Sequence, residues 1–215
     1  MNKVRIVIVD DHPIVRQGLS QLLSAEPDFE VIGEAGNAGD AMDLVEQQHP
    51  DLVIVDISLQ DISGMELIKQ IRARKQQIKI LVSSMHDEKL YAERCLHAGA
   101  MGYISKEETT EKMVAAIRQI LGGKVYLSPE MSEHFLSRMA KVGPDADRPS
   151  IATLSDRELE VFELIGRGMT TRKIAEVLNL SMKTIETYRE NIKIKLGLAN
   201  STELIRRAVQ WQESR

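Results

Sequence analysis

The first half of the chain alternates short apolar runs with stretches in which apolar residues recur every three or four positions. The runs are rich in β-branched residues and apolar on both faces, which is typical of strands buried in a parallel sheet. The recurring pattern is typical of amphipathic helices. We therefore predict five strands, at 4–9, 30–35, 52–55, 78–82 and 101–104. The helices that follow them are predicted at 13–24, 39–47, 63–72, 88–98 and 109–121.

Five strand–helix units with short connections predict an α/β fold, a doubly wound five-stranded parallel sheet. The expected strand order is 2-1-3-4-5, with the topological switch point between the first and third strands. Ligands of such sheets bind outside the carboxyl ends of the strands, near that switch point. Functional residues are therefore expected directly after the apolar runs.

A change of pattern after Gly123 separates two regions of the chain. A short helix is expected from Pro129 to about Met139, capped by Ser128. The segment Lys141–Ser150 that follows is dominated by Pro, Gly and Asp and has no apolar periodicity, which indicates an interdomain linker. The expected domains are 1–124, a short helix and linker at 125–152, and a second domain at 153–215.

The second domain is predicted to be a small all-α domain of four helices. Ser155 with Glu158 three residues later forms a capping box, which opens a helix to about Gly166. Thr171 is expected to cap the second helix, Ser181 the third, and Asn200 or Ser201 the fourth, which reaches about Trp211. The two middle helices are expected to end near Leu178 and Lys195. The turn of three residues between them, 179–181, has helix-turn-helix spacing.

Three carboxylates stand at the ends of predicted strands. Asp10 and Asp11 follow the first strand, and Asp56 follows the third. Like charges only a few ångströms apart are costly unless a cation neutralises them, and a hard divalent ion such as Mg²⁺ fits that need. One carboxylate can then act as a nucleophile toward phosphorus. The fourth strand ends in Ser83 and Ser84 and the fifth in Lys106, so a hydroxyl and an ammonium are also expected there.

The order Asp10-Asp11, Asp56, Ser84, Lys106 resembles the receiver domain of two-component response regulators, and the runs at 10–13 and 84–87 resemble the NarL/FixJ type. The resemblance covers roughly the first 120 residues. It implies a flavodoxin-like receiver in which Asp56 becomes a 4-aspartylphosphate and Lys106 pairs with the phosphoryl group. It also implies that Mg²⁺ is held by Asp10, Asp11, Asp56 and the backbone carbonyl of Ser58.

The same resemblance assigns the switch residues. Ser84 is favoured over the adjacent Ser83 as the switch hydroxyl, because Ser84 precedes Met85 as in the family pattern. Tyr103 is the expected aromatic partner whose ring turns inward on activation. The chain departs from the family at Leu59-Gln60, where Met-Pro is common; the loss of proline loosens the loop. This change leaves the loop geometry and the phosphoryl lifetime open.

The second domain resembles the LuxR-type DNA-binding domain through four motifs, at 154–161, 173–175, 181–186 and 195–197. The recognition helix would be 182–195, with Ile185, Ile192 and Leu196 on its core face. The expected DNA-binding residues are Thr171, Lys183, Thr184, Glu186, Thr187, Tyr188, Arg189, Glu190, Lys193 and Lys195. The lysines and the arginine of this set are expected to contact phosphates, whereas Glu186, Thr187 and Glu190 are placed to read bases.

Two questions about this domain stay open at this point. The two glutamates of the recognition helix are instead solvated ion-pair partners if they do not read bases. The last helix carries Leu204, Ile205, Ala208 and Trp211, more apolar surface than the domain needs for its own core. The excess is expected to form a dimer interface, so that paired domains read a two-fold site.

Composition and charge limit which partners and which location the protein can have. The net charge is −4, yet the part from Thr153 onward carries slightly more basic than acidic residues, as expected for a DNA-reading region. The single cysteine, Cys95, excludes an intrachain disulfide, and it is expected to pack rather than react. No apolar stretch or leader pattern predicts a membrane span or secretion, which is consistent with a cytoplasmic protein. The expected partners are a sensor histidine kinase, double-stranded DNA and, on DNA, a second copy of the chain.

Three other functions are less well supported by the same residues. A phosphatase or hydrolase would use the acidic Mg²⁺ crevice but has no need of a helix-turn-helix. A ligand-gated LuxR-type regulator would need a pocket ahead of the second domain, against which the acidic strand ends argue. A constitutive DNA binder would keep the fold without phosphorylation. We expect a phosphorylation-controlled transcription factor that is not an enzyme, with at most slow self-dephosphorylation.

Overall fold

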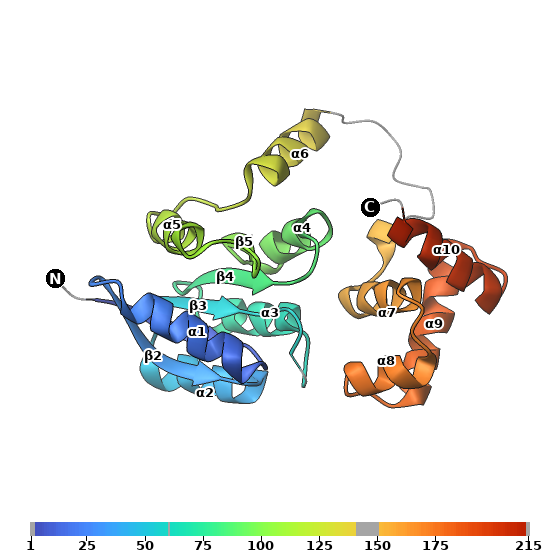
Figure 1. Cartoon of the computed structure of the whole chain (residues 1–215), viewed down its shortest axis with the longest axis horizontal. Helices are drawn as coiled ribbons and strands as arrows, with labels where there is room; N and C mark the ends of the chain where they lie inside the picture. Colours follow the sequence, from blue (N-terminus) through green and yellow to red (C-terminus); the bar gives the residue numbers. More distant parts are fainter. Residues whose placement is uncertain (1–2, 60, 141–150, 214–215) are drawn as a thin grey trace. The chain divides into compact units, whose positions relative to one another are not determined.

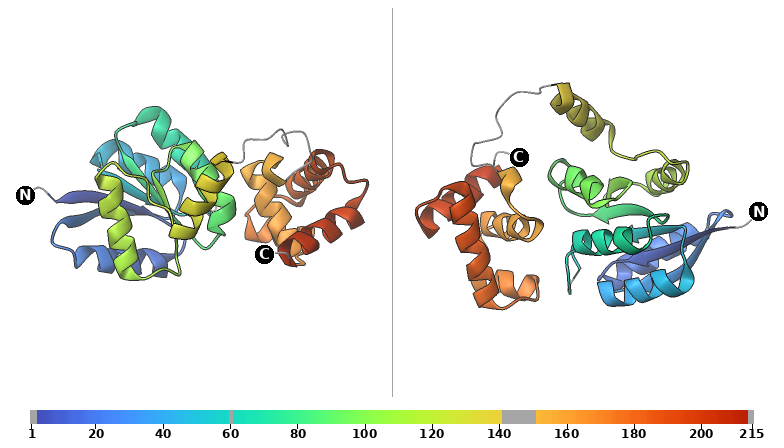
Figure 2. Two further views of the ribbon diagram at one scale, coloured as in Figure 1. Left: turned by 90° about the horizontal axis from the view of Figure 1, so that it is seen from above. Right: turned by 180° about the vertical axis from the view of Figure 1, so that it is seen from behind.

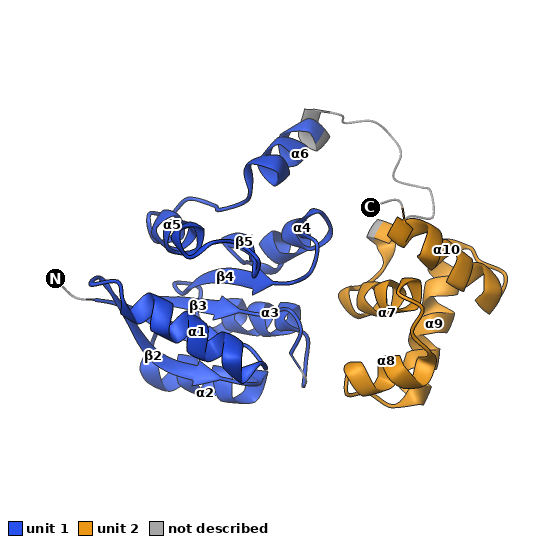
Figure 3. Ribbon diagram, viewed as in Figure 1, with its two compact units in different colours: residues 1–142 blue, residues 143–215 orange. Residues whose placement is uncertain are grey.

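The computed structural model describes residues 3–59, 61–140 and 151–213. These residues form two compact units, 1–142 and 143–215, which are coloured separately in Figure 3. The expected linker, Lys141–Ser150, lies outside the described residues, as does Gln60. Among the described residues, no helix is long and apolar enough to cross a bilayer.

The first unit is the predicted five-stranded parallel sheet, in the order β2-β1-β3-β4-β5 (Figure 1). The strands are β1 (Val4–Val9), β2 (Phe29–Ala35), β3 (Leu52–Val55), β4 (Lys79–Ser84) and β5 (Gly102–Ser105). The helices that cover the sheet are α1 (Pro13–Ser24), α2 (Ala38–Gln48), α3 (Gly64–Arg74), α4 (Glu88–Ala98) and α5 (Thr110–Leu121). The fold class and strand order predicted from the sequence are confirmed.

Small shifts of the predicted bounds have local causes. β4 extends two residues further than expected because Ser83 and Ser84 pair with Ile104 and Ser105 of β5. Ser63 lies outside α3 because its side chain caps that helix, accepting from the backbone N–H of Met65 at 3.3 Å. Strand pairing thus extends β4, and a local side-chain cap sets where α3 begins.

The two faces of the sheet carry alternate residues of each strand. On one face, Ile6 and Ile8 of β1 join Leu52 and Ile54 of β3, and the cluster continues to Leu23 of α1 and to Met113, Ile117 and Ile120 of α5. Helices α2, α3 and α4 form the other layer, and Figures 1 and 2 show the sheet between the two sets of helices. Burial on both faces explains why the strands read as continuous apolar runs.

The chain returns to the sheet after α5. Tyr126 pairs with β5, because its N–H donates to the Met101 carbonyl at 2.9 Å and its carbonyl accepts from the Tyr103 N–H at 3.1 Å. Helix α6 (Pro129–Ala140) follows and contacts α4, and the Ser128 N–H donates to Glu88 Oε1 at 2.9 Å. The contacts of 125–140 therefore belong to the first unit, whereas the sequence pattern placed the first boundary at 124.

The second unit contains a short 3-10 turn, Ile151–Thr153, and the four predicted helices, α7 (Asp156–Gly166), α8 (Thr171–Val177), α9 (Met182–Leu196) and α10 (Ser201–Glu213). The capping box predicted at Ser155 and Glu158 is present. The cap of α8 is Thr170 rather than Thr171, since the Thr170 side chain accepts from the Lys173 N–H at 3.3 Å. Asn200 caps α10 through the N–H of Glu203 at 3.0 Å.

The core of the second unit confirms the predicted face of α9. Ile185, Ile192 and Leu196 are buried, and Ile174 and Ala175 of α8 are buried with them. On α10, Leu204 and Ala208 are buried and the Trp211 ring packs on Phe162 with centroids 5.4 Å apart. Ile205 keeps 46% of its surface exposed, so this part of the apolar stripe is left over, as expected.

Candidate functional site

Asp10, Asp56 and Lys106 meet at the carboxyl ends of β1, β3 and β5. Each follows by two positions a residue of the apolar cluster on the α1/α5 face, so the period of two turns all three side chains toward the same face of the sheet. The strand register places Asp10 beside Asp56, because Val9 is paired with Val55 and the Asp56 N–H donates to the Val9 carbonyl at 2.9 Å.

Lys106 forms a bridge between two buried carboxylates. Its Nζ lies 2.6 Å from Asp10 Oδ2 and 2.7 Å from Asp56 Oδ2, and both carboxylate side chains are only 3% exposed. Burial by itself would lower the pKa of the Lys106 ammonium, but the charge of Asp56 and the hydrogen bonds to both carboxylates outweigh it and raise that pKa. Lys106 therefore stays charged at neutral pH and neutralises part of the negative charge of the crevice.

Potential metal-ligand atoms of the crevice gather around one point. One potential ligand atom from each of Asp10, Asp11, His12 and Asp56 lies within 4.8 Å of the others. Asp56 Oδ1 is buried and has no hydrogen-bond partner among the residues that the structure describes. A buried, charged oxygen without a partner is costly. The donor set, hard oxygens around this atom, fits Mg²⁺.

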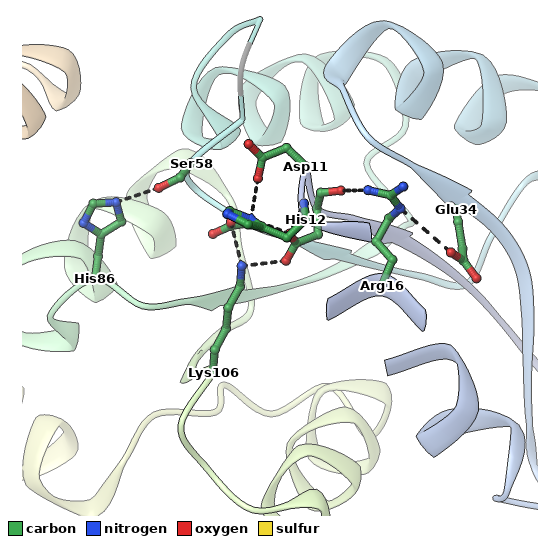
Figure 4. Close-up of polar contacts among 9 residues, drawn as sticks. Asp11, His12, Arg16, Glu34, Ser58, His86 and Lys106 are labelled. Atoms are coloured by element: carbon green, nitrogen blue, oxygen red, sulfur yellow. Dashed lines mark hydrogen bonds and ion pairs between the residues drawn. The ribbon is translucent and has the colours of Figure 1, made fainter. Parts of the chain in front are cut away.

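Two basic residues beside the carboxylates were missed from the sequence. His12 Nδ1 lies 2.7 Å from Asp11 Oδ1 and 3.2 Å from Asp10 Oδ1, and Arg16 donates to the backbone carbonyl of Asp10 (Figure 4). His12 lies in the run at 10–13, whose resemblance to the NarL/FixJ type assigns it no role of its own. The spacing of Arg16, four residues after His12 on the first turns of α1, is the signal that could have identified it.

Ser83 and Ser84 point to different sides of β4. Ser83 Oγ is buried without a hydrogen-bond partner among the described residues, and Ser83 lines a cavity of about 120 Å³ between α1 and α5. Ser84 Oγ accepts from the His86 N–H at 3.3 Å and is hydrogen-bonded to the Tyr103 phenol. The residue favoured from the sequence therefore contacts the expected aromatic partner.

Tyr103 lies inside the domain, toward α4. Its side chain is fully buried and its hydroxyl donates to the His86 carbonyl at 2.7 Å. Burial, reinforced by Cys95, raises the pKa of the Tyr103 phenol far above its usual value, so it stays protonated and can donate. Cys95 is itself buried, 3.3 Å from Met65 Sδ, in agreement with a packing role. The Leu59 side chain is 3% exposed and anchors the loop after Asp56.

The second candidate site is the exposed face of α9, the helix that follows α8 after a short turn. Lys183, Glu186 and Thr187 are exposed, as is Glu190, which pairs with Lys193 at 2.8 Å. Thr171, Thr184, Tyr188, Arg189 and Lys193 are half-buried. Thr187 Oγ1 donates to the Lys183 carbonyl at 3.0 Å. The Glu190–Lys193 pair is the helical ion pair that was the alternative to base reading for this glutamate.

One of the expected phosphate contacts, Lys195, has an ion-pair partner within the second unit. Lys195 does not present a lone ammonium to solvent, because its Nζ lies 2.6 Å from Oε2 of Glu158, the buried carboxylate of the capping box. The pair joins the end of α9 to the beginning of α7. No local pattern indicates this pair, since the two residues are 37 positions apart.

This ion pair predicts how the second unit responds to acid. Burial alone would raise the pKa of Glu158, but Lys195 and Ser155 outweigh it and hold the pKa below the usual 4.5. A lowered carboxyl pKa stabilises the fold above about pH 4.5 and the contribution is lost as pH falls through the lowered value.

Lys195→Ala should therefore cost about 1–2 kcal/mol at pH 7, less than a fully buried pair would because the Lys195 side chain is 38% exposed. It should also weaken the loss of stability below pH 4.5. Urea unfolding followed by the fluorescence of Trp211, the single tryptophan of the chain, reports on this unit. Lys173→Ala, whose pair with Glu176 lies at the surface, is the control. Equal pH profiles for wild type and Lys195→Ala would show that the pair does not set the acid response.

The chain is similar to known regulators over both units. Residues 6–118 match the family of response regulator receiver domains, and residues 152–208 match the luxR family of bacterial regulatory proteins. The transcriptional regulatory protein UhpA of Escherichia coli is 35% identical over 95% of this chain and 97% of its own. The transcriptional regulatory protein DegU of Brevibacillus brevis is 30% identical over 95% of this chain and 92% of its own.

Solved structures agree with this. The RcsB response regulator of Salmonella typhimurium superposes with a TM-score of 0.68 at 25% identity, covering 98% of each chain. A LuxR-family two-component response regulator from Aurantimonas superposes with a TM-score of 0.61 at 34% identity, covering 65% of this chain and all of the other. The chain therefore belongs to the two-component response regulators of the NarL/LuxR family, transcription factors with a receiver domain followed by a LuxR-type helix-turn-helix DNA-binding domain.

Proposed function

We propose that Asp56 accepts a phosphoryl group from a phosphohistidine of a partner sensor histidine kinase, and that this event controls DNA binding by the second domain. The observation that carries the proposal is the orphaned oxygen of Asp56, buried in a crevice with two further aspartates and bridged to Asp10 by Lys106. A carboxylate held in this way is a fixed nucleophile with a neutralising cation beside it.

Asp10, Asp11 and Asp56, with the backbone carbonyl of Ser58 that the family implies, would hold Mg²⁺. When bound, Mg²⁺ would supply positive charge for the oxygens of the incoming phosphoryl group. In the transfer itself, an Asp56 oxygen attacks phosphorus, and the bond from phosphorus to the donor nitrogen breaks with its electron pair returning to the imidazole. Lys106 neutralises negative charge at Asp56, so this chain contributes positioning and charge neutralisation to the transfer.

The output is proposed to pass through Ser84 and Tyr103. A phosphoryl group brings up to about −2 charge and new acceptor oxygens to the site. These would recruit Lys106 and the Ser84 hydroxyl and bias a two-state surface formed by α4 and β5. Loss of phosphoryl by hydrolysis would be slow, as suits a regulator rather than an enzyme.

DNA is the proposed target of the changed state. We propose that the exposed side of α9 enters the major groove, with Lys183 and Arg189 at phosphates and Thr187 near the bases. RcsB has been solved as two dimers bound to two DNAs, and bound to promoter rprA with the phosphomimetic BeF3-. By analogy, phosphorylation would release or dimerise this second domain on a two-fold site, with Ile205 of α10 as a candidate contact.

The test is phosphoryl uptake from acetyl phosphate, followed by the mass of the intact protein. Wild type should gain one phosphoryl group with Mg²⁺ and none after chelation, whereas Asp56→Asn should gain none in either case. Selection of bound genomic fragments, before and after donor treatment, reads the DNA response of the same samples. Equal uptake by Asp56→Asn would overturn the assignment of the acceptor, and fragments recovered equally from all samples would overturn control by phosphorylation.

A further inference from the structure

A cavity of about 120 Å³ lies on the α1/α5 face of the sheet, next to the carboxylate crevice. Ser83 of β4 lines this cavity; it follows Leu81 of the apolar cluster by two positions and therefore points to the same face. Lys106 also lines it, so the cavity and the crevice share a wall. None of the crevice aspartates is among the described residues that line the cavity, so it is a separate space.

The α1 side of the cavity is apolar. Val15, Leu19 and Leu22 recur three or four positions apart on this helix, and Met113 of α5 lines the cavity with them. An apolar cavity of about 150 Å³ is large enough to hold a molecule of benzene. A space of about 120 Å³ with such a wall therefore suits one six-membered ring, or an alkyl group of similar size.

The sheet side of the cavity carries a hydroxyl whose hydrogen bonds are not satisfied. Ser83 is 2% exposed, and its Oγ is buried with no hydrogen-bond partner among the described residues. Such a hydroxyl costs free energy when it is left unpaired, and it can both donate and accept. An ordered water needs about two to four polar partners, and the α1 side chains offer none. A ligand that joins a hydroxyl to an apolar body therefore matches these walls better than water does.

Two of the other hydroxyls that line the cavity are engaged locally, between the end of β5 and the start of α5. Ser105 Oγ accepts from the Glu107 N–H at 3.2 Å, and the Thr109 side chain is hydrogen-bonded to the Glu111 carboxylate. They are less available than Ser83 to an incoming molecule. Ser83 is therefore the group that a ligand hydroxyl is expected to meet.

The charged residues that line the cavity already have partners of opposite charge. The Lys106 ammonium lies between Asp10 and Asp56. The Glu108 carboxylate accepts a hydrogen bond from Lys112 at 2.6 Å. A charge on the ligand would therefore be buried against apolar side chains without a counter-ion, which is costly. The cavity thus favours a neutral ligand over an anion or a cation.

We propose that this cavity is a binding site for a small neutral molecule that joins one ring, or an alkyl group of similar size, to a hydroxyl. The ring lies against α1 and Met113, and the hydroxyl exchanges a hydrogen bond with Ser83 Oγ. Phenol is the simplest molecule of this class. The site is separate from the place of phosphoryl transfer at Asp56, so its test does not depend on phosphorylation.

The experiment titrates phenol into the full-length protein, whose methionine methyl groups are isotope-labelled, and follows the methyl signal of Met113 by NMR. This signal should shift to saturation with a Kd on the order of 1 mM. Toluene lacks the hydroxyl and benzoate carries a charge, so each should bind at least about fivefold more weakly than phenol. The methyl signal of Met182, which is 55% exposed in the second unit, should not move.

Two variants locate the site, and a third is their control. Ser83→Ala keeps the cavity but removes the hydroxyl, so phenol should bind about fivefold more weakly while toluene binds as before. Val15→Phe fills the cavity from α1 and should abolish the binding of both molecules. Ile14→Phe adds the same ring one position earlier, where the side chain is 84% exposed, and should leave binding unchanged.

A Met113 signal that phenol does not move would overturn the proposal and leave the cavity to water. Equal shifts at Met113 and Met182 would mean non-specific contact, and phenol binding that survives Val15→Phe would place the ligand elsewhere; either result overturns the proposal as well. So would a Met113 signal that moves with protein concentration alone, because the cavity would then hold a side chain of a second copy. If Val15→Phe fails to fold, the loss of preference for phenol over toluene in Ser83→Ala decides the question.

Discussion

Replacing Gly64 by alanine should disrupt the acceptor loop and destabilise the receiver by about 3 kcal/mol or more, at or beyond the upper end of ordinary overpacking. A Cβ at this position would lie 2.0 Å from the Asp56 carbonyl oxygen and 2.9 Å from both Asp56 C and Ile57 Cα. All three are backbone atoms, so no side chain can rotate away. Moving them would break the 2.8 Å hydrogen bond from the Gly64 N–H to the Ile57 carbonyl and shift Asp56.

The measurement is urea unfolding followed by far-UV circular dichroism, with Trp211 fluorescence reporting separately on the second unit. The receiver transition should move to lower urea while the tryptophan transition stays in place. Gly18→Ala is the matched control, because nothing lies within 4 Å of a Cβ there and alanine favours the helix by up to about 1 kcal/mol. A receiver as stable with Gly64→Ala as with Gly18→Ala would show that the loop yields easily.

Removing the ammonium of Lys106 should be the other large effect. Lys106→Met leaves Asp10 and Asp56, both buried, without the cation that lies 2.6–2.7 Å from each. Breaking a buried ion pair by removing one partner costs about 3–5 kcal/mol. Added Mg²⁺ should therefore stabilise Lys106→Met more than wild type, because a second cation then replaces the lost charge. Urea unfolding with and without Mg²⁺ measures both effects.

The sign of the pH dependence gives an independent check. The pKa of Lys106 is raised in the folded protein, so its contribution is complete below the ordinary value of 10.5 and is lost as pH rises through the raised value. Wild type should lose stability in that alkaline range, and Lys106→Met should lack this loss. Lys112→Met, which removes a surface pair with Glu108, should change stability by less than about 1 kcal/mol. Similar losses for both variants would contradict a special role for the Lys106 bridge.

The local sequence pattern determined much of the fold of this protein. The apolar runs specified five strands because a strand buried on both faces needs continuous β-branched residues. The polar residues that follow four of these runs then had to lie at one edge of a parallel sheet. The capping box at Ser155 and Glu158 and the glycine at 197 are likewise local, since a cap needs partners only three or four residues away. For this reason the fold and the residues of the carboxylate crevice could be read from the sequence.

Tertiary structure decided what depends on distant partners. Glu158 is also the partner of Lys195, and this ion pair links α7 to α9. Gly64 is required by the close approach of the Asp56 carbonyl rather than by a tight turn, since its φ is not positive. His86 reaches Ser58 across 28 positions. Pair contacts of this kind have no period along the chain, because they arise from how the elements pack and not from the conformation of any one of them.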